Sequence, residues 1–241
     1  MDTYLEALRK VRTPIVYDAV ERFNVRPRSE GYTDSSIRCI LPGLGAMVGY
    51  ACTAKMVAEL LPAEGECSVP SEAVWQYVSS AKRPSVIAVQ DLDQPPARGC
   101  AWGDLAASIF LNLGCVGAVT NGGVRDIREV EKLGFHLFAQ TPVVGHANIR
   151  FVEIDTPLKI GSLIVRPGDL LHGDEHGVMV IPREISLPDL LRVIDAFLSS
   201  EKTIVDYCTG PNFDLQELIH LVALHEERVG GHWKVLVREK K

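Results

Sequence analysis

The sequence has no pair of cysteines at the spacing of a metal site. Its six cysteines are scattered, and no two of them form a C-x-x-C pair. This spacing argues against the cysteine-rich zinc sites of fingers and ribbons. Cys39, Cys52 and Cys115 lie among apolar residues and are interpreted as small buried side chains. A catalytic thiol needs an electropositive setting, and none is evident around them.

Long apolar runs are also lacking. No stretch approaches the roughly 20 residues needed to span a bilayer. The chain does not open with a basic segment followed by an apolar one, which a secretory signal would require. We therefore expect neither a membrane span nor a signal peptide, and a cytoplasmic protein. At 241 residues the chain is long enough for one domain with a sizeable core, or for a domain with a tail.

The chain has fewer basic residues than acidic ones. The chain has 25 Lys and Arg against 31 Asp and Glu, for a net charge of −6. Such a balance argues against a nucleic acid or an anionic membrane as the main partner, although a local basic pocket for an anionic substrate is compatible with it. The sequence also lacks a glycine-rich nucleotide loop followed by a ribose-binding acid, which argues against a methyltransferase.

The clearest pattern lies in residues 102–138, which predict a helix, a buried strand, a glycine turn, a second helix and a strand. Residues 116–120 form a short apolar run without polar alternation, typical of a strand covered on both faces. The sequence NGG at 121–123 follows, a turn that permits positive φ and close backbone approach. Arg125 and Asp126 then lie at the carboxyl end of a buried strand, where open α/β sheets place ligands.

The aspartates at the two helix starts have two interpretations. Asp126 with Glu129 three residues later resembles a capping box, and Asp104 precedes an apolar helical face. Capping is the more common use of an aspartate at such a position, but one carboxylate can both cap a helix and ligate a metal. Arg125, taken alone, is more often an ion-pair or surface arginine than a substrate clamp.

The helix start at Gly103 and Asp104 offers a second kind of site. The first amides of a helix have no intrahelical partner, and the helix dipole is positive there. The amides near Leu105 and Ala106 could therefore bind a small carboxylate.

These residues together resemble the signature of the RraA-like family: Asp104, twenty intervening residues, Arg125-Asp126 and then Glu129. The likeness extends over roughly residues 5–205. The further segments that carry it are, in order, TPIVYDA from Thr13, PG at 42–43, GYACTA from Gly49, SVIAVQ from Ser85, RPGDL from Arg166 and DEHGVMVIP from Asp174.

The resemblance implies a fold. We expect a single α/β domain over residues 1–208, with a β-sandwich core flanked by helices as in swivelling phosphohistidine domains. A helical tail over residues 209–241 follows. The resemblance also implies homotrimers or homohexamers with active sites between subunits.

The resemblance implies two functions of different classes. The family includes class II 4-hydroxy-4-methyl-2-oxoglutarate / 4-carboxy-4-hydroxy-2-oxoadipate aldolases, which also decarboxylate oxaloacetate. Such an enzyme is a metal-dependent lyase that releases pyruvate from a small 2-keto acid through a metal-stabilised enolate. The family also includes non-catalytic regulators that bind a protein partner such as a ribonuclease. The complete acidic set with its arginine favours the enzyme, because a binding module does not need it.

The resemblance also assigns roles to residues. Asp126 would ligate Mg²⁺ or Mn²⁺ directly, and Asp104 would hold a metal-bound water. Arg125 would face the ketone oxygen of the substrate and stabilise the enolate. The substrate carboxylate would bind at Gly103, Leu105 and Ala106. A glutamate of a neighbouring subunit's C-terminal segment would hold another water, and Glu201 is the candidate by its position.

The rest of the chain predicts further helices and strands joined by three loops. We expect the loops at 24–36, 59–70 and 91–99 to select the substrate. The predicted helices are 4–12, a short one after Thr13-Pro14, 71–81, 188–199 and 214–229; the predicted strands are 46–58, 86–89, 140–144, 149–154, 158–160, 163–165 and 178–181.

Two features have open interpretations. His172 and His176 are placed in a turn between strands, where a structural or hydrogen-bonding role is favoured over metal ligation. An apolar stripe on the last helix, which includes Leu215, Ile219 and Val222, fits packing on its own domain or docking on a neighbouring subunit.

Overall fold

The computed structural model describes residues 3–59 and 68–238 and separates the chain into two compact units. One unit is Ser29–Ile181, and the other joins Met1–Arg28 to Pro182–Lys241. The domain boundary expected between residues 208 and 209 stays a prediction. Among the described residues, no helix is both long enough and apolar enough to cross a membrane.

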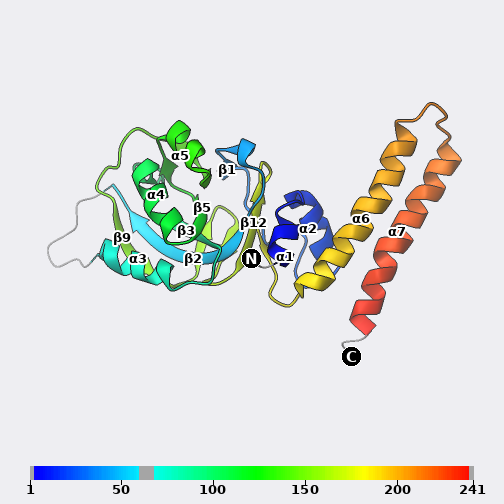
Figure 1. The fold of residues 1–241 in the computed structure, drawn as a ribbon, viewed down its shortest axis with the longest axis horizontal. Coiled ribbons are helices and arrows are strands. Elements are labelled where there is room, and N and C mark those ends of the chain that lie inside the picture. The colour runs from blue at the N-terminus through cyan, green and yellow to red at the C-terminus, as the bar shows by residue number, and fades with distance from the viewer. Residues whose placement is uncertain (1–2, 60–67, 239–241) are drawn as a thin grey trace. The chain divides into compact units, whose positions relative to one another are not determined.

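An eight-stranded mixed sheet is the centre of the unit 29–181 (Figure 1). Its order is β1-β7-β5-β3-β2-β12-β13, and β9 also pairs with β2. Strands β2, β3, β5 and β7 are parallel, whereas the other pairings are antiparallel. The strands are β1 (Arg38–Cys39), β2 (Met47–Val57), β3 (Ser85–Asp91), β5 (Cys115–Thr120), β7 (His136–Ala139), β9 (Arg150–Ile154), β12 (Leu170–Asp174) and β13 (Gly177–Ile181).

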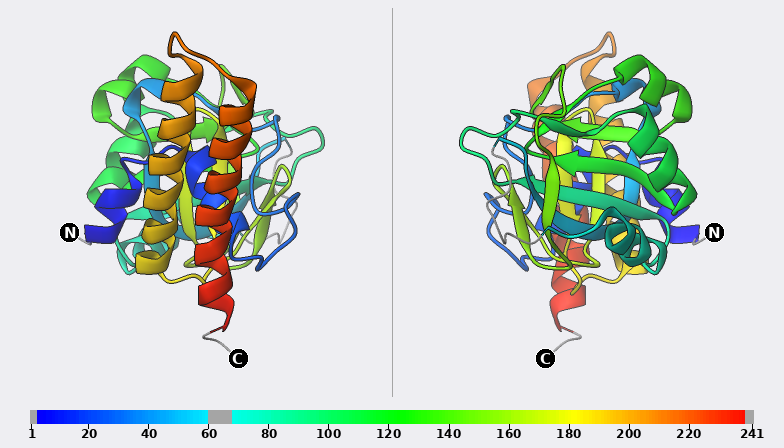
Figure 2. Two further views of the ribbon diagram at one scale, coloured as in Figure 1. Left: turned by 90° about the vertical axis from the view of Figure 1, so that its right-hand side faces the viewer. Right: turned by 90° about the vertical axis from the view of Figure 1, so that its left-hand side faces the viewer.

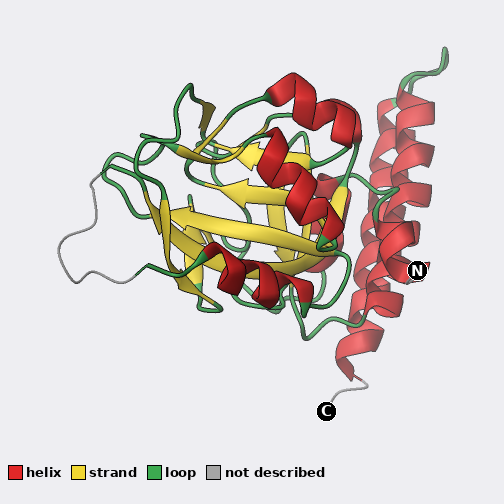
Figure 3. Cartoon of the chain, turned by 60° about the vertical axis from the view of Figure 1, so that its left-hand side comes forward, coloured by secondary structure: helices red, strands yellow, loops and turns green. Residues whose placement is uncertain are grey.

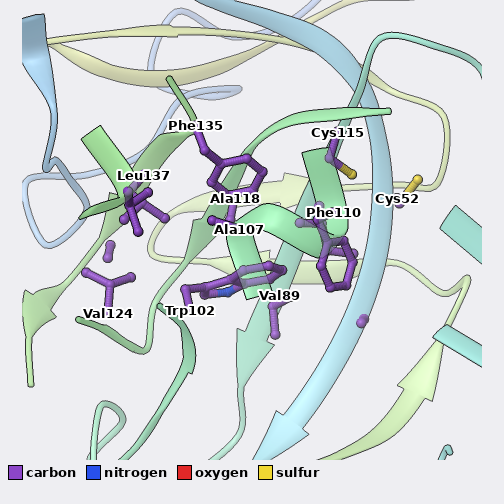
Figure 4. Close-up of a cluster of buried hydrophobic side chains, with 14 of the residues drawn as sticks. Cys52, Val89, Trp102, Ala107, Phe110, Cys115, Ala118, Val124, Phe135 and Leu137 are labelled. Carbon is purple, nitrogen blue, oxygen red and sulfur yellow. The ribbon is translucent and has the colours of Figure 1, made fainter. Parts of the chain in front are cut away.

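Three helices connect the parallel strands and cover one face of the sheet (Figure 3). They are α3 (Ser71–Ser79), α4 (Asp104–Asn112) and α5 (Ile127–Leu133). Parallel strands need such crossovers, since a tight hairpin can join only antiparallel neighbours. The helices bury Val74, Phe110 and Val130 against apolar side chains of the sheet, among them those labelled in Figure 4.

The other face of the sheet carries a second core. The hairpin β10 (Leu158–Ile160) and β11 (Leu163–Val165) buries its alternate residues there, against Val86, Ala88 and other sheet side chains. Apolar layers on both faces explain why β3 and β5 lack polar alternation. The expected mixed α/β fold, with layers of β structure flanked by helices, is confirmed.

A small parallel sheet extends the larger one at the carboxyl ends of β3, β5 and β7. Its order is β4-β6-β8, with β4 (Cys100–Trp102), β6 (Gly123–Val124) and β8 (Thr141–Pro142). The sequence did not predict β4 or β6, because two or three residues are too few to show a period. A short 3-10 helix, η1 (Pro42–Leu44), precedes β2.

The described part of the second unit contains four helices, α1 (Thr3–Leu8), α2 (Thr13–Glu21), α6 (Leu187–Cys208) and α7 (Leu215–Arg238). Figure 2 shows α6 and α7 side by side, where Ser200 Oγ lies 2.7 Å from His225 Nδ1. The predicted cap at Thr13 is shifted by one residue, since Arg12 is the N-cap and Thr13 is the first helical residue. Helix α6 is longer than the predicted 188–199, so Glu201 lies on it.

Other elements differ from the sequence prediction in detail. His172 lies within β12 and is buried, so the predicted turn is confined to the residues after Asp174. The predicted loops at 24–36 and after Asp91 contain no helix or strand, although Tyr32 forms an isolated bridge with Met179. Of the predicted loop at 59–70, residues 60–67 lie outside the described residues.

The stripe on α7 is uncovered in the first half of the helix. Leu215, Ile219 and Val222 are 57%, 54% and 42% exposed, whereas Val229 is buried. Docking of this stripe on a neighbouring subunit stays a prediction.

Candidate active site

Two chain segments bring the central predicted residues together. Strand β4 leads into Gly103 and Asp104, and the parallel strand β6 leads into Arg125 and Asp126. The amide of Arg125 donates to the carbonyl of Trp102 at 2.9 Å, which continues the pairing of the two strands up to the site. The helices α4 and α5 therefore begin next to each other.

The Asp126 carboxylate points toward the start of α4. Its Oδ2 accepts a hydrogen bond from the Asp104 amide at 3.4 Å and lies 3.3 Å from Arg125 Nε. A carboxylate is favourable here because the first amides of a helix carry partial positive charge. The side chains of Arg125 and Asp126 are each about one third exposed, so part of both polar groups stays available to a ligand.

The capping-box interpretation of Asp126 is wrong. Asp126 precedes α5 with φ 53° and ψ 40°, in the left-handed region, and its side chain makes no capping hydrogen bond. A non-glycine residue in this region costs free energy and persists only where its surroundings hold it. The carboxylate is directed at α4 instead of its own helix.

The direction of the Asp126 carboxylate, toward α4 and not toward its own helix, predicts how Asp126→Asn behaves. Loss of a true cap costs about 1 kcal/mol, which lowers Tm by about 2–4 °C in a chain of this size. Because Asp126 does not cap its own helix, and because asparagine tolerates left-handed φ and keeps an oxygen that can accept from the Asp104 amide, we expect Tm to fall by less than this while Mn²⁺ binding weakens.

Ser186→Ala is the matched control for that thermal measurement. Ser186 is a true N-cap, whose Oγ accepts from the Asp189 amide at 3.3 Å. Loss of this cap should lower Tm by the full amount expected above, about 2–4 °C. A larger Tm loss in Asp126→Asn than in Ser186→Ala, measured by differential scanning calorimetry, would contradict the geometric argument.

The Asp104 carboxylate does not occupy the expected cap position either. Gly103 is the N-cap of α4, and Asp104 is the first helical residue. Asp104 Oδ1 accepts from the Leu105 amide at 2.7 Å. A substrate carboxylate at that amide, one of the predicted positions, would therefore have to displace Asp104 Oδ1.

Gly103 is required by space rather than by its backbone angles. Its φ of −145° is open to any residue. A Cβ at this position would lie 2.4 Å from Asp126 Oδ2, far inside van der Waals contact. Sequence reasoning selected Gly103 as a substrate-binding position and missed this steric role, because the close neighbour is 23 residues away in the chain.

The floor of the site is apolar. Trp102 is 1% exposed, with its ring 5.0 Å from Phe110 in an edge-to-face arrangement and 6.1 Å from Phe135 in a stacked one (Figure 4). Its Nε1 has no hydrogen-bond partner. Burial raises the pKa of the neighbouring Cys100 thiol, and Arg125 offsets only part of that rise. The thiol is thus unsuited to act as a nucleophile at neutral pH.

Sequence reasoning also missed Asp91 and Asn121, which brace the two segments from beneath. The Asn121 side chain makes two hydrogen bonds to the backbone of Asp91, and the Asp91 carboxylate accepts from the amides of Asp93 and Ala97. Burial raises the pKa of the Asp91 carboxyl, and these amide hydrogen bonds oppose the rise. The only sequence signal was the NGG turn.

Glu201 belongs to the other compact unit and lies on α6. Within that unit, burial raises the pKa of Asp18, and the negative charges of Glu201 and Glu21 raise it further. Helices α2 and α6 therefore hold acidic groups near one another. The role expected for Glu201 stays a prediction.

Among the described residues, one other group could hold a metal ion: Asp174, Glu175 and His176, whose ligand atoms lie within 4.8 Å of one another. His176 Nδ1 and its amide both lie 2.9 Å from Asp174 Oδ1. Hydrogen bonding is therefore an observed role of His176. His172 is not a member of this group.

The donor set of the candidate site fits a hard divalent cation. Asp126 and Asp104 offer carboxylate oxygens, which Mg²⁺ and Mn²⁺ prefer, and the site has no soft sulfur ligand within its exposed part. Mg²⁺ binds few protein carboxylates and keeps several waters, so one aspartate with a second nearby is a sufficient set.

Comparison with known proteins identifies the family. Residues 13–180 match the RraA-like family, described as Aldolase/RraA. The chain belongs to the RraA-like family. A relative from Halalkalibacterium halodurans, named "Putative 4-hydroxy-4-methyl-2-oxoglutarate aldolase", is 37% identical over 82 residues, which cover 34% of this chain and 39% of that protein. A relative of the same name from Ectopseudomonas mendocina is 28% identical over 38% of this chain and 57% of its own length.

Solved structures share the RraA-like fold. An uncharacterised protein from Pseudomonas syringae has a TM-score of 0.71 at 21% identity, over 93% of this chain and 94% of its own. RraAS2 of Streptomyces coelicolor, an unusual member of the RNase ES inhibitor RraA family, has a TM-score of 0.63 at 19% identity, over 87% of this chain and 98% of its own. At these identities the likeness concerns the fold alone.

Proposed function

We propose that this RraA-like protein is a divalent-cation-dependent carbon–carbon lyase that releases pyruvate from a small 2-keto acid. The supporting observation is the meeting of Arg125 and Asp126 with the amino end of α4 at Asp104. A guanidinium, two carboxylates and helix amides in one place suit a substrate with an adjacent ketone and carboxylate. Relatives named as aldolases support the same class of reaction.

The substrate would bind by its carboxylate at the first turn of α4. The amides of Leu105 and Ala106 are the proposed donors, once Asp104 Oδ1 leaves the Leu105 amide that it occupies here. This displacement would turn the Asp104 carboxylate toward the reacting end of the substrate. Arg125 would then face the C2 ketone oxygen.

Cleavage follows from these positions. The C4 hydroxyl loses its proton to a water ordered by Asp104, the C4–O bond becomes a carbonyl, and the C3–C4 bond breaks. The electron pair of that bond forms the C2–C3 double bond and places the negative charge on the C2 oxygen. The Arg125 guanidinium stabilises that charge, and a donor of this kind is typically worth about 3 kcal/mol. Protonation at C3 gives pyruvate.

Asp126 would hold the cation, with Asp104 beside it. When bound, Mg²⁺ or Mn²⁺ supplies Lewis-acid polarisation of the ketone. Oxaloacetate decarboxylation needs the same enolate but no proton acceptor, and is therefore the less demanding reaction of the site.

The test is pyruvate release from 4-hydroxy-4-methyl-2-oxoglutarate and from oxaloacetate, first with Mg²⁺ and then with EDTA. Pyruvate release from both substrates supports the proposal if EDTA abolishes it. The ratio of the two rates then ranks the substrates. Release from oxaloacetate alone points to a decarboxylase or to an aldolase for another substrate. No release from either overturns the lyase and favours the regulatory protein that binds a partner.

We further propose that the active protein is a homotrimer or homohexamer in which Glu201 of a neighbouring subunit completes each site. Glu201→Gln and Arg125→Ala should then each lose most of their activity alone. Oligomers reassembled from a mixture of both variants should recover activity, because some sites contain both original residues. Absence of recovery in mixed oligomers, verified by native mass spectrometry, would assign Glu201 to its own subunit or to no catalytic role.

A further inference from the structure

The site is built on two limbs of the chain, which leave the neighbouring strands β3 and β5 and pair through β4 and β6 before they reach the site. One limb leaves β3, passes through 92–99 into β4 and ends at Asp104. The other leaves β5, passes through the NGG turn into β6 and ends at Arg125 and Asp126. The relative position of the limbs therefore decides the distance between the acidic groups and the guanidinium.

The pairing of β4 with β6 is short. It joins Cys100 to Gly123 and Trp102 to Val124, with a register shift between the two pairs. An irregular ladder of this length does not by itself fix how far one strand has moved along the other. Other contacts between the two limbs must therefore help to set the register of β4 against β6.

Asp91 contacts both limbs at their common base. Its carboxylate, 1% exposed, accepts from the Ala97 amide at 2.8 Å and from the Asp93 amide at 3.0 Å, which holds the limb that leads to Asp104. Its backbone is held by the other limb. Asp91 N donates to Asn121 Oδ1 at 2.8 Å, and Asn121 Nδ2 donates to the Asp91 carbonyl at 2.8 Å.

The residue types match these tasks. The two hydrogen bonds of Asn121 need an acceptor and a donor on one side chain, which an amide supplies and a carboxylate or an alkyl group does not. Asp91 instead needs two acceptor oxygens, because both of its side-chain partners are amide donors. The fit is close, since a Cβ at Gly122 would lie 3.2 Å from Asp91 Oδ2.

We propose that Asp91 and Asn121 form a positioning clamp that sets the separation of Asp104 from Arg125 and Asp126. The proposal rests on the lyase function proposed above. Neither residue touches the substrate; each acts through the limb it holds. Asn121 governs the limb with the enolate-stabilising arginine, whereas the Asp91 carboxylate governs the limb whose helix amides bind the substrate carboxylate.

The two halves of the clamp should therefore fail differently. Asn121→Ala should lower kcat by about 10- to 100-fold with KM near that of the unmodified protein, because a small misplacement of catalytic groups has effects of this size. Asp91→Asn replaces one acceptor with a donor and should chiefly raise KM. Asn121→Ser, which keeps one hydroxyl as donor and acceptor, is the milder variant should Asn121→Ala fold poorly.

Matched controls separate positioning from general loss of stability. Asn112→Ala removes an exposed amide that donates to the Ser108 carbonyl at 2.9 Å at the far end of α4. Asp34→Asn alters a carboxylate that accepts from the Ser36 amide at 2.9 Å near the β10–β11 turn. Both should shift Tm without changing the ratio of kcat to KM.

The experiment combines steady-state kinetics on the full-length protein with calorimetry and amide hydrogen exchange across residues 122–127, which include the Arg125 amide bonded to Trp102. Faster exchange there in Asn121→Ala than in Asn112→Ala, together with the kcat loss, supports the clamp. Unchanged exchange overturns it, as does a kcat loss no greater than that of Asn112→Ala. If the unmodified protein releases no pyruvate, the lyase proposal fails, and the exchange measurement still decides whether the clamp exists.

Discussion

Arg125→Ala should lower kcat for pyruvate release by about 10²–10³-fold, the usual effect of removing a preorganised donor to a developing oxyanion. The backbone amide of Arg125 donates a hydrogen bond to the Trp102 carbonyl, and Arg125 Nε lies 3.3 Å from Asp126 Oδ2. The guanidinium therefore lies beside Asp126 before the substrate arrives. Arg125→Lys should recover only part of the activity, because an ammonium keeps the charge and loses the planar fork.

Arg128→Ala is the control for that loss. Arg128 is the second residue of α5 and is exposed, so its removal changes the net charge equally without removing a residue of the proposed site. Pyruvate release at saturating substrate and Mg²⁺ is the measurement. Full metal-dependent activity in Arg125→Ala would contradict the proposed mechanism. Equal losses of activity in Arg125→Ala and Arg128→Ala would indicate a general electrostatic effect.

Gly103→Ala should reduce activity by about 10²-fold, although it adds a single methyl group. The new Cβ would lie 2.4 Å from Asp126 Oδ2, so either the carboxylate must turn away or β4 must shift. Both movements break the hydrogen bond from the Asp104 amide to Asp126. We expect the affinity for Mn²⁺, measured by isothermal titration calorimetry, to fall in parallel with the activity.

Gly43→Ala is the matched control for Gly103→Ala. Its Cβ would have Glu131 Oε1 as nearest neighbour at 3.8 Å, an ordinary contact. This variant should keep both activity and cation affinity. A Gly103→Ala protein that binds Mn²⁺ as tightly as the unmodified protein would show that the carboxylate and the glycine are not coupled as the geometry requires.

Arg125→Ala and Gly103→Ala test different parts of one site. Arg125→Ala removes charge stabilisation and should leave Mn²⁺ affinity nearly unchanged or slightly higher, since a cationic side chain next to Asp126 is lost. Gly103→Ala displaces the carboxylate itself and should weaken Mn²⁺ binding. Opposite responses in cation affinity would therefore assign the two roles separately.

Much of the fold could be predicted from the sequence. A helix at 71–81 and strands at 158–160 and 163–165 were predicted, and α3 and the β10–β11 hairpin confirm them. These elements follow local rules, in which the spacing of apolar residues and the conformational freedom of a turn residue suffice. Local rules failed for β12, because its sequence LLHGD contains the buried polar residues His172 and Asp174.

The identity of the candidate site residues also came from the sequence. Asp104, Arg125 and Asp126 were selected by their spacing, and the structure brings all three together. Their interactions were predicted less well. A local pattern cannot tell a cap from a side chain that reaches another helix, and the capping interpretation of Asp126 was therefore wrong.

The sequence by itself determined most of the helices and longer strands, the turn chemistry between them and the membership of the RraA-like family. Only the tertiary structure decided where the Asp126 carboxylate points, why position 103 must be glycine, and which residues brace the two limbs. The physical reason is separation along the chain. Asp104 and Asp126 are 22 residues apart, and Asp91 and Asn121 are 30 residues apart. Such partners are chosen by the packing of whole elements, which no local propensity contains.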